Sequence, residues 1–290
     1  MDSSQVPFGL LLRRWRTQRR MLQSDLAMAA ETSARHLSCL ETCKAQPSRE
    51  MVIRLAEYLD IPLRDRNTLL LAAGFAPSFT ERSVVGLEAA KTAIDSVLQA
   101  HKPYPAFAVD RRWNVVSSNA ALPQLYEGCA EDLMRSPVNA VRLILHPAGM
   151  GPRVLNYAAW RAHTLGLLRQ QLQTRVDPVI KALADEIAAY PIPAHSEPLD
   201  TFNAAQSLAT PLRVATRLGV VTFLNTITVF GSPHDVTLSE LALEMLFPAD
   251  EGTVEIVRTM VAESAAAAGN DVASDAANAD NGLSRSPILT

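Results

Sequence analysis

The first quarter of the chain carries the hydrophobic spacing of short helices. Phe8, Leu11, Leu12 and Trp15 recur at the i, i+3, i+4 and i+7 positions of a helix with one buried face. Further stretches of the same periodicity follow, bounded by capping residues such as Ser48 and by glycine or proline. We expect these helices at about residues 23–30, 34–42, 49–59 and 64–73. The pattern predicts a compact all-helical module.

Beyond Pro103 the spacing changes to the alternation typical of β-strands. Residues 107–109 and 113–115 alternate on either side of a short polar turn, which predicts two antiparallel strands. A helix is then expected to begin near Ser118. This change in periodicity separates the second part of the chain from the helical module.

Two longer strands are predicted further along, at about residues 212–216 and 220–230. Asn225 is a polar interruption on the otherwise apolar face of the second strand. The apolar residues expected to share that face are Val221, Phe223, Ile227 and Val229.

Helices are predicted between and after these strands. One has apolar positions from 154 to 172, and another is opened by the N-cap Asp177 with a proline after it. The capping box formed by Thr237 and Glu240 predicts a last helix. A helix at about 84–100 would bridge the two parts. Strands at both ends with helices between them favour an antiparallel sheet that carries its helices over one face.

The composition places the chain among ordinary globular proteins. It has 290 residues, of which 48% are hydrophobic and 20% are charged. Apolar runs are too short to span a membrane, and the apolar residues near the N-terminus precede the arginines, the reverse of a secretion signal. Three cysteines suit a reducing compartment better than a disulfide framework. We expect a soluble, cytoplasmic protein with no membrane partner.

The charge is distributed unevenly along the chain. The formal net charge is -3, but residues 1–82 carry twelve Lys or Arg against nine Asp or Glu. Within residues 10–20 there are five arginines and no acidic residue. Such a density suits contact with phosphates, although a solvated helix face would have the same composition.

The helical module contains a motif that spans its second to fourth helices. This motif resembles the helix-turn-helix of the Xre and lambda-repressor-like regulators, and the resemblance extends from residue 8 to about 62. It implies binding to double-stranded DNA, with the N-terminal half of the 34–42 helix in the major groove. The residues that carry the motif are Gln23, Leu26, Ala27, Thr32, Ser33, Leu37, Ser38, Leu40, Glu41, Lys44, Pro47 and Ser48.

The resemblance also implies which side chains contact the DNA. Arg35 is expected to read a base, because a guanidinium can bond O6 and N7 of guanine together. Gln23, at the start of the second helix, would bind a phosphate, and Lys44 and Arg14 would contact further phosphates. The positions expected to face the groove are Ser33, Ala34, Arg35, Ser38 and Cys39.

Two residues depart from the pattern of the family. Glu31 lies in the turn and Cys43 follows the third helix, at positions where these regulators usually have glycine. Both positions often require a positive φ angle, which side chains other than glycine disfavour, so these residues concern the geometry of the loops and not the fold.

Motifs in the second part of the chain resemble the MmyB-like regulators, whose C-terminal half is a PAS-like ligand-binding domain. That domain has been associated with fatty-acid-like ligands, so the resemblance implies a small apolar effector. No other cofactor is expected. The matching residues are Leu71 to Pro77, Tyr104 to Asn119, Asn139, Leu143, His146, Pro147, Gly149 and Phe247 to Asp250.

The patterns and the two resemblances together predict an α domain followed by an α+β domain. We expect a five-helix lambda-repressor-like helix-turn-helix domain at 1–76 and a linker with a connecting helix at 77–102. A PAS-like antiparallel-sheet domain with helices would occupy 103–260, and a disordered tail 261–290.

Candidate ligand-binding residues in the second domain fall into two groups. Phe107, Trp113 and Phe223 would form apolar walls, although buried aromatic residues are also ordinary core residues. A carboxylate head group would be bound near the start of the long helix, where the alternative is surface and turn residues. The candidates for this polar end are Asn156, Arg161 and His163, and Asn119 either joins them or caps a turn.

A cluster of soft ligands lies on the expected recognition helix. His36, Cys39 and Cys43 would face one side of a helix, but a fourth ligand and a paired CxxC motif are missing. The alternative is two ordinary thiols, and we assign no metal-binding residues.

These observations predict a sequence-specific transcriptional regulator that binds DNA as a homodimer and responds to a small apolar, fatty-acid-like effector. A dimer is expected because one recognition helix reads only a few base pairs. The chain has no phosphate loop and no hydrolase or zinc-protease motif, so we do not expect an enzyme. Two alternatives are a redox- or metal-responsive regulator acting through the cluster of His36, Cys39 and Cys43, and a small-molecule carrier that docks a partner without binding DNA.

Overall fold

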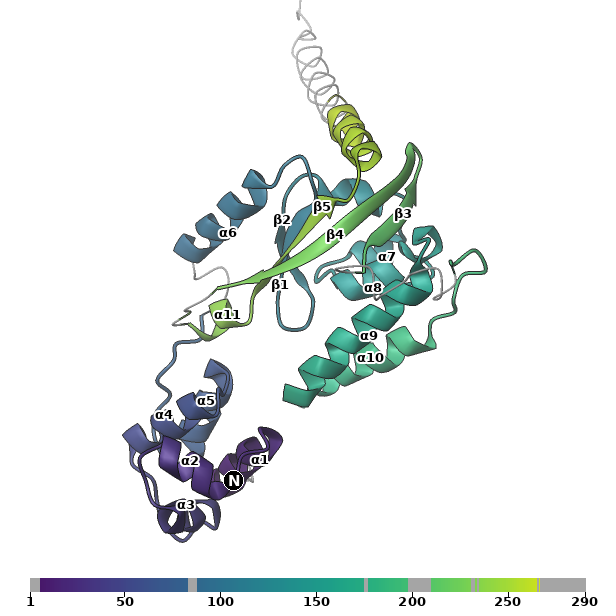
Figure 1. Cartoon of the computed structure of the whole chain (residues 1–290). Coiled ribbons are helices and arrows are strands. Elements are labelled where there is room, and N and C mark those ends of the chain that lie inside the picture. Colours follow the sequence, from purple (N-terminus) through teal and green to yellow (C-terminus); the bar gives the residue numbers. More distant parts are fainter. Residues whose placement is uncertain are drawn as a thin grey trace, which may run out of the picture. The chain divides into compact units, whose positions relative to one another are not determined.

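The computed structural model describes residues 6–82, 88–174, 177–197, 210–230, 233, 235–264 and 266. The chain divides into two compact units (Figure 1). The helical unit comprises the chain up to Lys91 together with residues 229–241, and the sheet unit comprises the rest. Residues 229–241 therefore pack with the helical unit although they lie, in sequence, between strands of the sheet. The tail predicted from residue 261 begins too early, because residues 261–264 are helical, and its part from 267 onward lies outside the described residues.

The N-terminal part of the helical unit contains the five short helices that the hydrophobic spacing predicted. Ser33 and Ser48 cap the third and fourth, since their hydroxyls accept hydrogen bonds from the backbone N–H groups of His36 and Met51. The bounds are α1 (Phe8–Gln18), α2 (Gln23–Ala29), α3 (Ala34–Glu41), α4 (Arg49–Tyr58) and α5 (Leu63–Ala72).

The core of the helical unit is mostly aliphatic, with Phe8 and Trp15 as buried aromatic members, and is shared by all five helices. Leu12, Leu37, Leu40 and Leu70 are completely buried. The first two predicted core positions of α1, Phe8 and Leu11, are buried and half-buried respectively. The side of α3 opposite to Leu37 and Leu40 consequently faces solvent.

Glu31 and Cys43 adopt the left-handed backbone conformation that these positions often require, although neither is glycine. Their φ angles are +51° and +58°. Each follows a short helix and turns the chain sharply toward the next element, which explains why a residue without a Cβ is favoured there.

The sheet unit contains a five-stranded sheet of order β2-β1-β5-β4-β3. β1 pairs antiparallel with both β2 and β5, and β3 pairs antiparallel with β4. The sheet thus brings the first and last strands of this region together at its centre. The strands are β1 (Ala106–Val109), β2 (Val115–Ser118), β3 (Leu212–Thr216), β4 (Gly219–Val229) and β5 (Ala242–Pro248).

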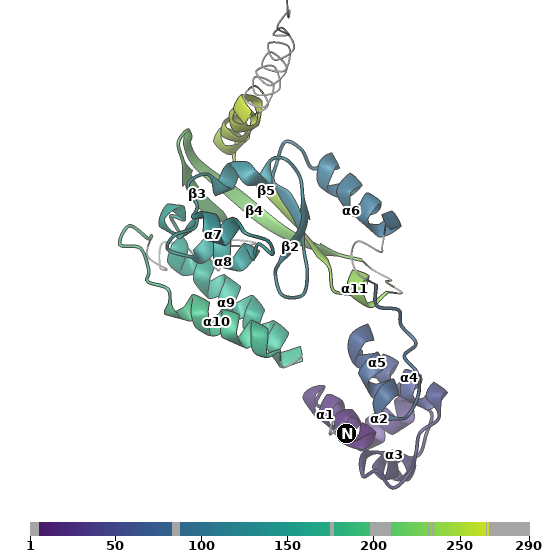
Figure 2. The ribbon, with the colours of Figure 1, turned by 180° about the vertical axis from the view of Figure 1, so that it is seen from behind.

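Helices cover the sheet, as expected for an α+β domain. Figures 1 and 2 show α7 to α10 gathered on one side of the sheet. On α6, Ile94 and Leu98 are buried, and Asp95 accepts a hydrogen bond from Ser117 of β2. The bounds are α6 (Glu88–Ala100), α7 (Glu131–Met134), α8 (Ala140–Leu145), α9 (Tyr157–Thr174), α10 (Pro178–Ala189) and the short 3-10 helices η2 (Leu122–Tyr126) and η3 (Gly151–Arg153).

The prediction of a helix beginning near Ser118 is wrong. β2 continues to Ser118, and the next helical element is the 3-10 helix η2. Buried Asn119 ends the strand by accepting hydrogen bonds from the backbone N–H groups of Ala106 and Ala121. The amide of Asn119 thereby fixes the chain in a turn before helical geometry begins.

The capping box at Thr237 and Glu240 was also misassigned. The N-cap is Asp235, which accepts hydrogen bonds from two backbone N–H groups of the four-residue helix α11 (Val236–Ser239). The chain then forms β5, a strand that the sequence analysis did not predict, and the last described helix spans 251–264. Asp250 caps that helix through the backbone N–H of Thr253.

The apolar face predicted for β4 is buried only in part. Val221 and Phe223 are completely buried, whereas Ile227 and Val229 are 46% and 63% exposed. The pairing of β3 with β4 ends at Leu212 and Phe223, so the later part of β4 extends beyond this partner.

We predict that replacing Glu31 with glycine stabilises the helical unit. A left-handed conformation costs a residue with a side chain about 1–2 kcal/mol, and the greater freedom of glycine in the unfolded chain offsets about half of this. The expected gain is about 0.5–1 kcal/mol in the free energy of unfolding, measured by urea denaturation. Glu31→Ala is the matched control, because it removes the same exposed carboxylate without relieving the backbone. Equal stability of the two variants would contradict the prediction.

Candidate DNA-binding surface and ligand cavity

A buried ion pair holds α3 against α1 and α2. The guanidinium of Arg16 on α1 donates to both carboxylate oxygens of Glu41 on α3, at 2.6 and 3.0 Å. It also donates to the carbonyl of Met21 at 2.7 Å, and the amide of Gln23 on α2 donates to Glu41 at 2.7 Å. The side chains of Arg16 and Glu41 are 11% and 1% exposed. Three helices therefore meet on one carboxylate.

The electrostatics of this ion pair keep Glu41 ionised. Burial on its own would raise the pKa of Glu41, but the hydrogen bonds from Arg16 and Gln23 outweigh it, so the net pKa lies below its ordinary value. The pKa of Arg16 is raised because Glu41 stabilises its charged form. Both groups are charged at neutral pH, and each neutralises the charge of the other.

The N-terminal half of α3 presents the residues expected to face the DNA groove. Ser33, Ala34 and Arg35 are exposed, and Ser38 and Cys39 are half-buried. Because buried Leu37 and Leu40 face the core, these side chains lie on the outer side of the helix. The structure thus brings the five predicted groove-facing positions onto one surface.

The predicted phosphate-binding residues differ in their exposure. Arg14 and Lys44 are exposed. Gln23 is half-buried, and its amide nitrogen is bonded to Glu41. No side chain caps the N-terminus of α2, so no capping group competes for its first backbone N–H groups.

The arginine run between residues 10 and 20 does not form a single basic face. Arg16 belongs to the buried ion pair, and Arg19 donates to the carbonyls of Leu59 and Asp60 at 2.9 and 2.7 Å. Arg13, Arg14 and Arg20 remain exposed. Part of the charge that suggested contact with phosphates therefore stabilises the fold.

The structure describes no metal-binding arrangement around the thiols of α3. Cys39 is half-buried and Cys43 is exposed. Among the described residues, no three His, Cys, Asp or Glu side chains gather as they would around a metal ion.

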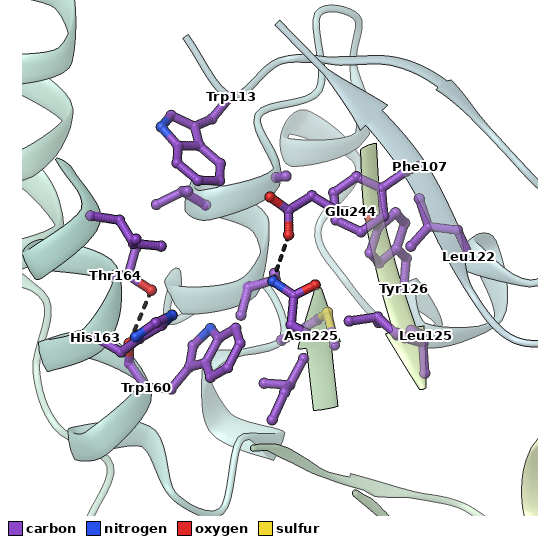
Figure 3. A pocket seen from close by; sticks show the side chains of 17 residues that line it. Phe107, Trp113, Leu122, Leu125, Tyr126, Trp160, His163, Thr164, Asn225 and Glu244 are labelled. Carbon is purple, nitrogen blue, oxygen red and sulfur yellow. Dashed lines mark hydrogen bonds between the residues drawn. The ribbon is translucent and has the colours of Figure 1, made fainter. Parts of the chain in front are cut away.

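The sheet unit encloses a cavity between the sheet, η2 and helices α8 and α9. Its volume is about 650 Å³, which includes solvent at its mouth. The walls are mostly apolar, and four aromatic residues contribute to them: Phe107, Trp113, Tyr126 and Trp160 (Figure 3). An apolar lining with a few polar groups is typical of small-molecule sites. The aliphatic part of the lining comprises Leu122, Leu125, Ala140, Val141, Ile144, Met150, Leu167, Leu212 and Leu246.

Two side chains from neighbouring strands form a polar pair in this cavity. The amide nitrogen of Asn225 on β4 donates to a carboxylate oxygen of Glu244 on β5 at 2.5 Å. Figure 3 shows the pair between Phe107 and Tyr126 on one side and residues of α9 on the other. Burial raises the pKa of Glu244 to about 7, and the hydrogen bond from Asn225 only partly opposes this rise.

The remaining polar residues of the lining come from α9. The hydroxyl of Thr164 donates to the carbonyl of Trp160 at 2.9 Å. Burial lowers the pKa of His163, so its imidazole is neutral at pH 7. No lysine or arginine is found in the described lining of the cavity.

The structure brings only some of the predicted ligand-binding residues together. Phe107, Trp113 and His163 line the cavity, whereas Phe223 is completely buried outside its lining. Trp113 has a positive φ of +67°, and its indole N–H donates to Gln171 of α9 at 3.1 Å. Two cavity walls are thereby joined.

The other predicted polar residues have structural partners outside the cavity. Asn156 donates to the carbonyl of Pro211 and accepts from the backbone N–H of Arg213. Arg161 donates to the carbonyl of Tyr190 at 2.7 Å. Asn119 donates to the carbonyls of Leu98 and Tyr104, at 3.0 and 2.8 Å. These side chains do not converge on one head-group site.

Family models match both the N-terminal helices and the region that contains the sheet. A model of the MmyB-like transcription regulator ligand binding domain matches residues 90–276, and a helix-turn-helix domain model matches residues 7–69. The chain belongs to the MmyB-like transcription regulators. No curated protein matches the chain. No helix in the described part of this regulator is long and apolar enough to cross a lipid bilayer.

Sequence analysis of this MmyB-like regulator missed the polar pair of the cavity. Asn225 was identified only as an interruption of a strand face, and Glu244 was not identified at all. The available signal was a single acidic residue at position 244, enclosed by the apolar residues of a stretch with strand propensity. A buried carboxylate in a strand is uncommon unless it has a partner or a function.

We predict that Glu244 makes the MmyB-like regulator less stable as the pH rises. In the folded protein the carboxyl keeps its proton up to about pH 7. In the unfolded chain it loses that proton near pH 4.3. The folded state therefore binds more protons in this interval, and stability falls between about pH 4.5 and 7 by up to about 3 kcal/mol.

The measurement compares urea unfolding of the wild type and Glu244→Gln at pH 5 and pH 8. The glutamine variant should lose less stability on going to pH 8, because it has no carboxyl at position 244 to lose a proton. Glu255→Gln, at an exposed position, is the control and should behave as the wild type. The prediction fails if wild type and Glu244→Gln respond to pH identically.

Proposed function

We propose that this MmyB-like regulator binds a specific DNA sequence as a homodimer in the cytoplasm and that an apolar effector in the cavity of the sheet unit controls this binding. The observation that carries the proposal is the coexistence in one chain of an exposed recognition helix, fixed by a buried ion pair, and an apolar cavity with an unusual polar end.

In this proposal Arg35 reads a base in the major groove. It is exposed on the first turn of α3, and it forms no intramolecular hydrogen bond or ion pair in the described structure that would compete with DNA. Ser33, Ala34, Ser38 and Cys39 surround it and would complete the groove contacts. Gln23, Arg14 and Lys44 would bind phosphates and fix the register of α3 on the duplex.

The dimer follows from the small size of the recognition surface. One eight-residue helix contacts only a few base pairs, so selective binding requires two copies spaced one helical turn apart on a palindrome.

The effector would be fatty-acid-like in its aliphatic body. Leu122, Leu125, Val141 and Leu246 offer side chains that pack against methylene groups, and aromatic rings close the remaining walls. Burial of such a body provides most of the affinity, while the polar end determines orientation.

Residues 229–241 offer a route from the cavity to the DNA-binding helices. They follow β4, which carries Asn225, and precede β5, which carries Glu244. Within the helical unit, Arg64 of α5 donates to both carboxylate oxygens of Glu240, at 2.7 and 3.0 Å. The backbone N–H of Val236 donates to the carbonyl of Thr80 at 2.8 Å. A displacement of either strand would therefore pull on residues 229–241, which are hydrogen-bonded within the helical unit.

We predict that Arg35→Ala weakens specific DNA binding by about 5- to 150-fold, which corresponds to the loss of about 1–3 kcal/mol from a bidentate contact with guanine. The ligand is a duplex selected from a random library by the wild-type protein, and binding is measured by fluorescence anisotropy over a range of salt concentrations. Lys44→Ala should instead reduce the salt dependence by about one phosphate contact.

Arg169→Ala, at an exposed position on α9, is the control and should bind as the wild type. The titration endpoint should correspond to two chains per duplex. A selection that enriches no sequence would overturn the DNA-binding proposal, and a one-to-one complex would overturn the dimer.

We predict that Glu240→Gln uncouples the cavity from the DNA. Coupling between two sites is reciprocal, so adding the selected duplex to the wild type should change amide hydrogen exchange in residues 221–228 and 242–248. The variant weakens the bond to Arg64 and should show a smaller change, while Glu251→Gln, at an exposed position, should respond as the wild type. Equal responses of wild type and Glu240→Gln would refute this route.

A further inference from the structure

We propose that the cavity selects an apolar molecule whose polar end carries a hydrogen-bond donor, a hydroxyl, amide or ammonium group, and that it rejects carboxylates. This inference rests on the proposed function of the cavity as an effector site and specifies the chemistry of its ligand. It follows from the acceptors that remain unpaired at the polar end.

Two buried oxygens of the polar pair have no hydrogen-bond partner among the described residues. They are the second carboxylate oxygen of Glu244, Oε1, and the amide oxygen of Asn225, Oδ1. Glu244 as a whole is only 3% exposed, and both residues line the cavity. A buried acceptor without a donor is costly, so a ligand that supplies a donor gains more here than it would gain in water.

The rest of the lining offers no charge that would attract an anion. The hydrogen of the Thr164 hydroxyl is already donated to Trp160, and His163 is neutral at pH 7. Arg161 lies two residues before His163 in the sequence, but it donates to the carbonyl of Tyr190 and is not part of the lining. At pH 8, where most Glu244 carboxyls are ionised, a fatty-acid carboxylate would therefore meet Glu244 without a counter-ion, and two adjacent carboxylates cannot both stay ionised without a large penalty.

The apolar surroundings strengthen this discrimination. Phe107 lies directly opposite Glu244 in the antiparallel pairing of β1 with β5. Trp113 and Trp160 extend the aromatic wall around the polar pair (Figure 3). In such a low-dielectric environment a missing or repelled hydrogen bond lowers affinity more than it does at a surface. An ammonium group would also benefit from the faces of the aromatic rings.

The test compares three probes that share a ten-carbon chain and differ in the head group: 1-decanol, decylamine and decanoate. Binding to the full-length protein is measured by isothermal titration calorimetry at pH 8, below the micelle-forming concentrations. The wild type should bind 1-decanol or decylamine about tenfold or more tightly than decanoate. Selective binding of decylamine identifies a cationic ligand, and binding of 1-decanol identifies a neutral one.

Glu244→Gln supplies the decisive comparison. The glutamine amide brings a donor and removes the negative charge, so decanoate should bind about tenfold or more tightly to this variant than to the wild type, and decylamine more weakly. Glu255→Gln removes an exposed carboxylate outside the cavity and should keep the wild-type preference.

The outcomes separate this inference from the function on which it rests. If decanoate binds the wild type as tightly as 1-decanol and decylamine do, the head-group selectivity is wrong and the apolar effector site stands. If none of the three probes binds to the wild type, the effector site itself is wrong.

Discussion

The DNA-binding half of this protein depends on one buried carboxylate. Glu41 receives Arg16 from α1 and Gln23 from α2, and it lies at the end of the helix that would enter the DNA groove. Removing one member of such a pair leaves an uncompensated charge in the core, which typically costs about 3–5 kcal/mol. Apolar residues could supply comparable stability. The ion pair adds directional hydrogen bonds that join α3, the predicted recognition helix, to both α1 and α2.

Glu244, the buried carboxylate of the sheet unit, is paired much less completely than Glu41. Both oxygens of Glu41 accept hydrogen bonds from a cation, whereas Glu244 has one neutral partner and one oxygen without any in the described structure. The first carboxylate has a lowered pKa and the second a raised one, in agreement with this difference. A fully paired charge stabilises a fold, while an incompletely paired group in a cavity is typical of a binding site.

Most helices and the helix-turn-helix could be predicted from the sequence, because local signals determine them. Ser33, Ser48 and Asp177 cap their helices through their own side chains, and Glu31 adopts the expected turn conformation. The role of Arg16 could not be predicted, since a buried arginine and its exposed neighbours look alike within a basic run. β5 and Glu244 were missed because their positions depend on pairing with β1, from which they are more than a hundred residues away in the sequence.

The incomplete pairing of Glu244 also explains how an occupied cavity could act on the rest of the chain. A ligand shifts a conformational equilibrium only by as much as its affinity differs between the two states. Asn225 and Glu244 lie on different strands, and each carries a buried oxygen without a partner among the described residues, so the proposed donor would bind at β4, at β5 or at both. The segment that joins those two strands, 229–241, is held to α5 by Arg64 and Glu240. A donor that binds better when β4 and β5 shift would favour the shifted state, and the proposed route to the helical unit would then run through the segment between these strands.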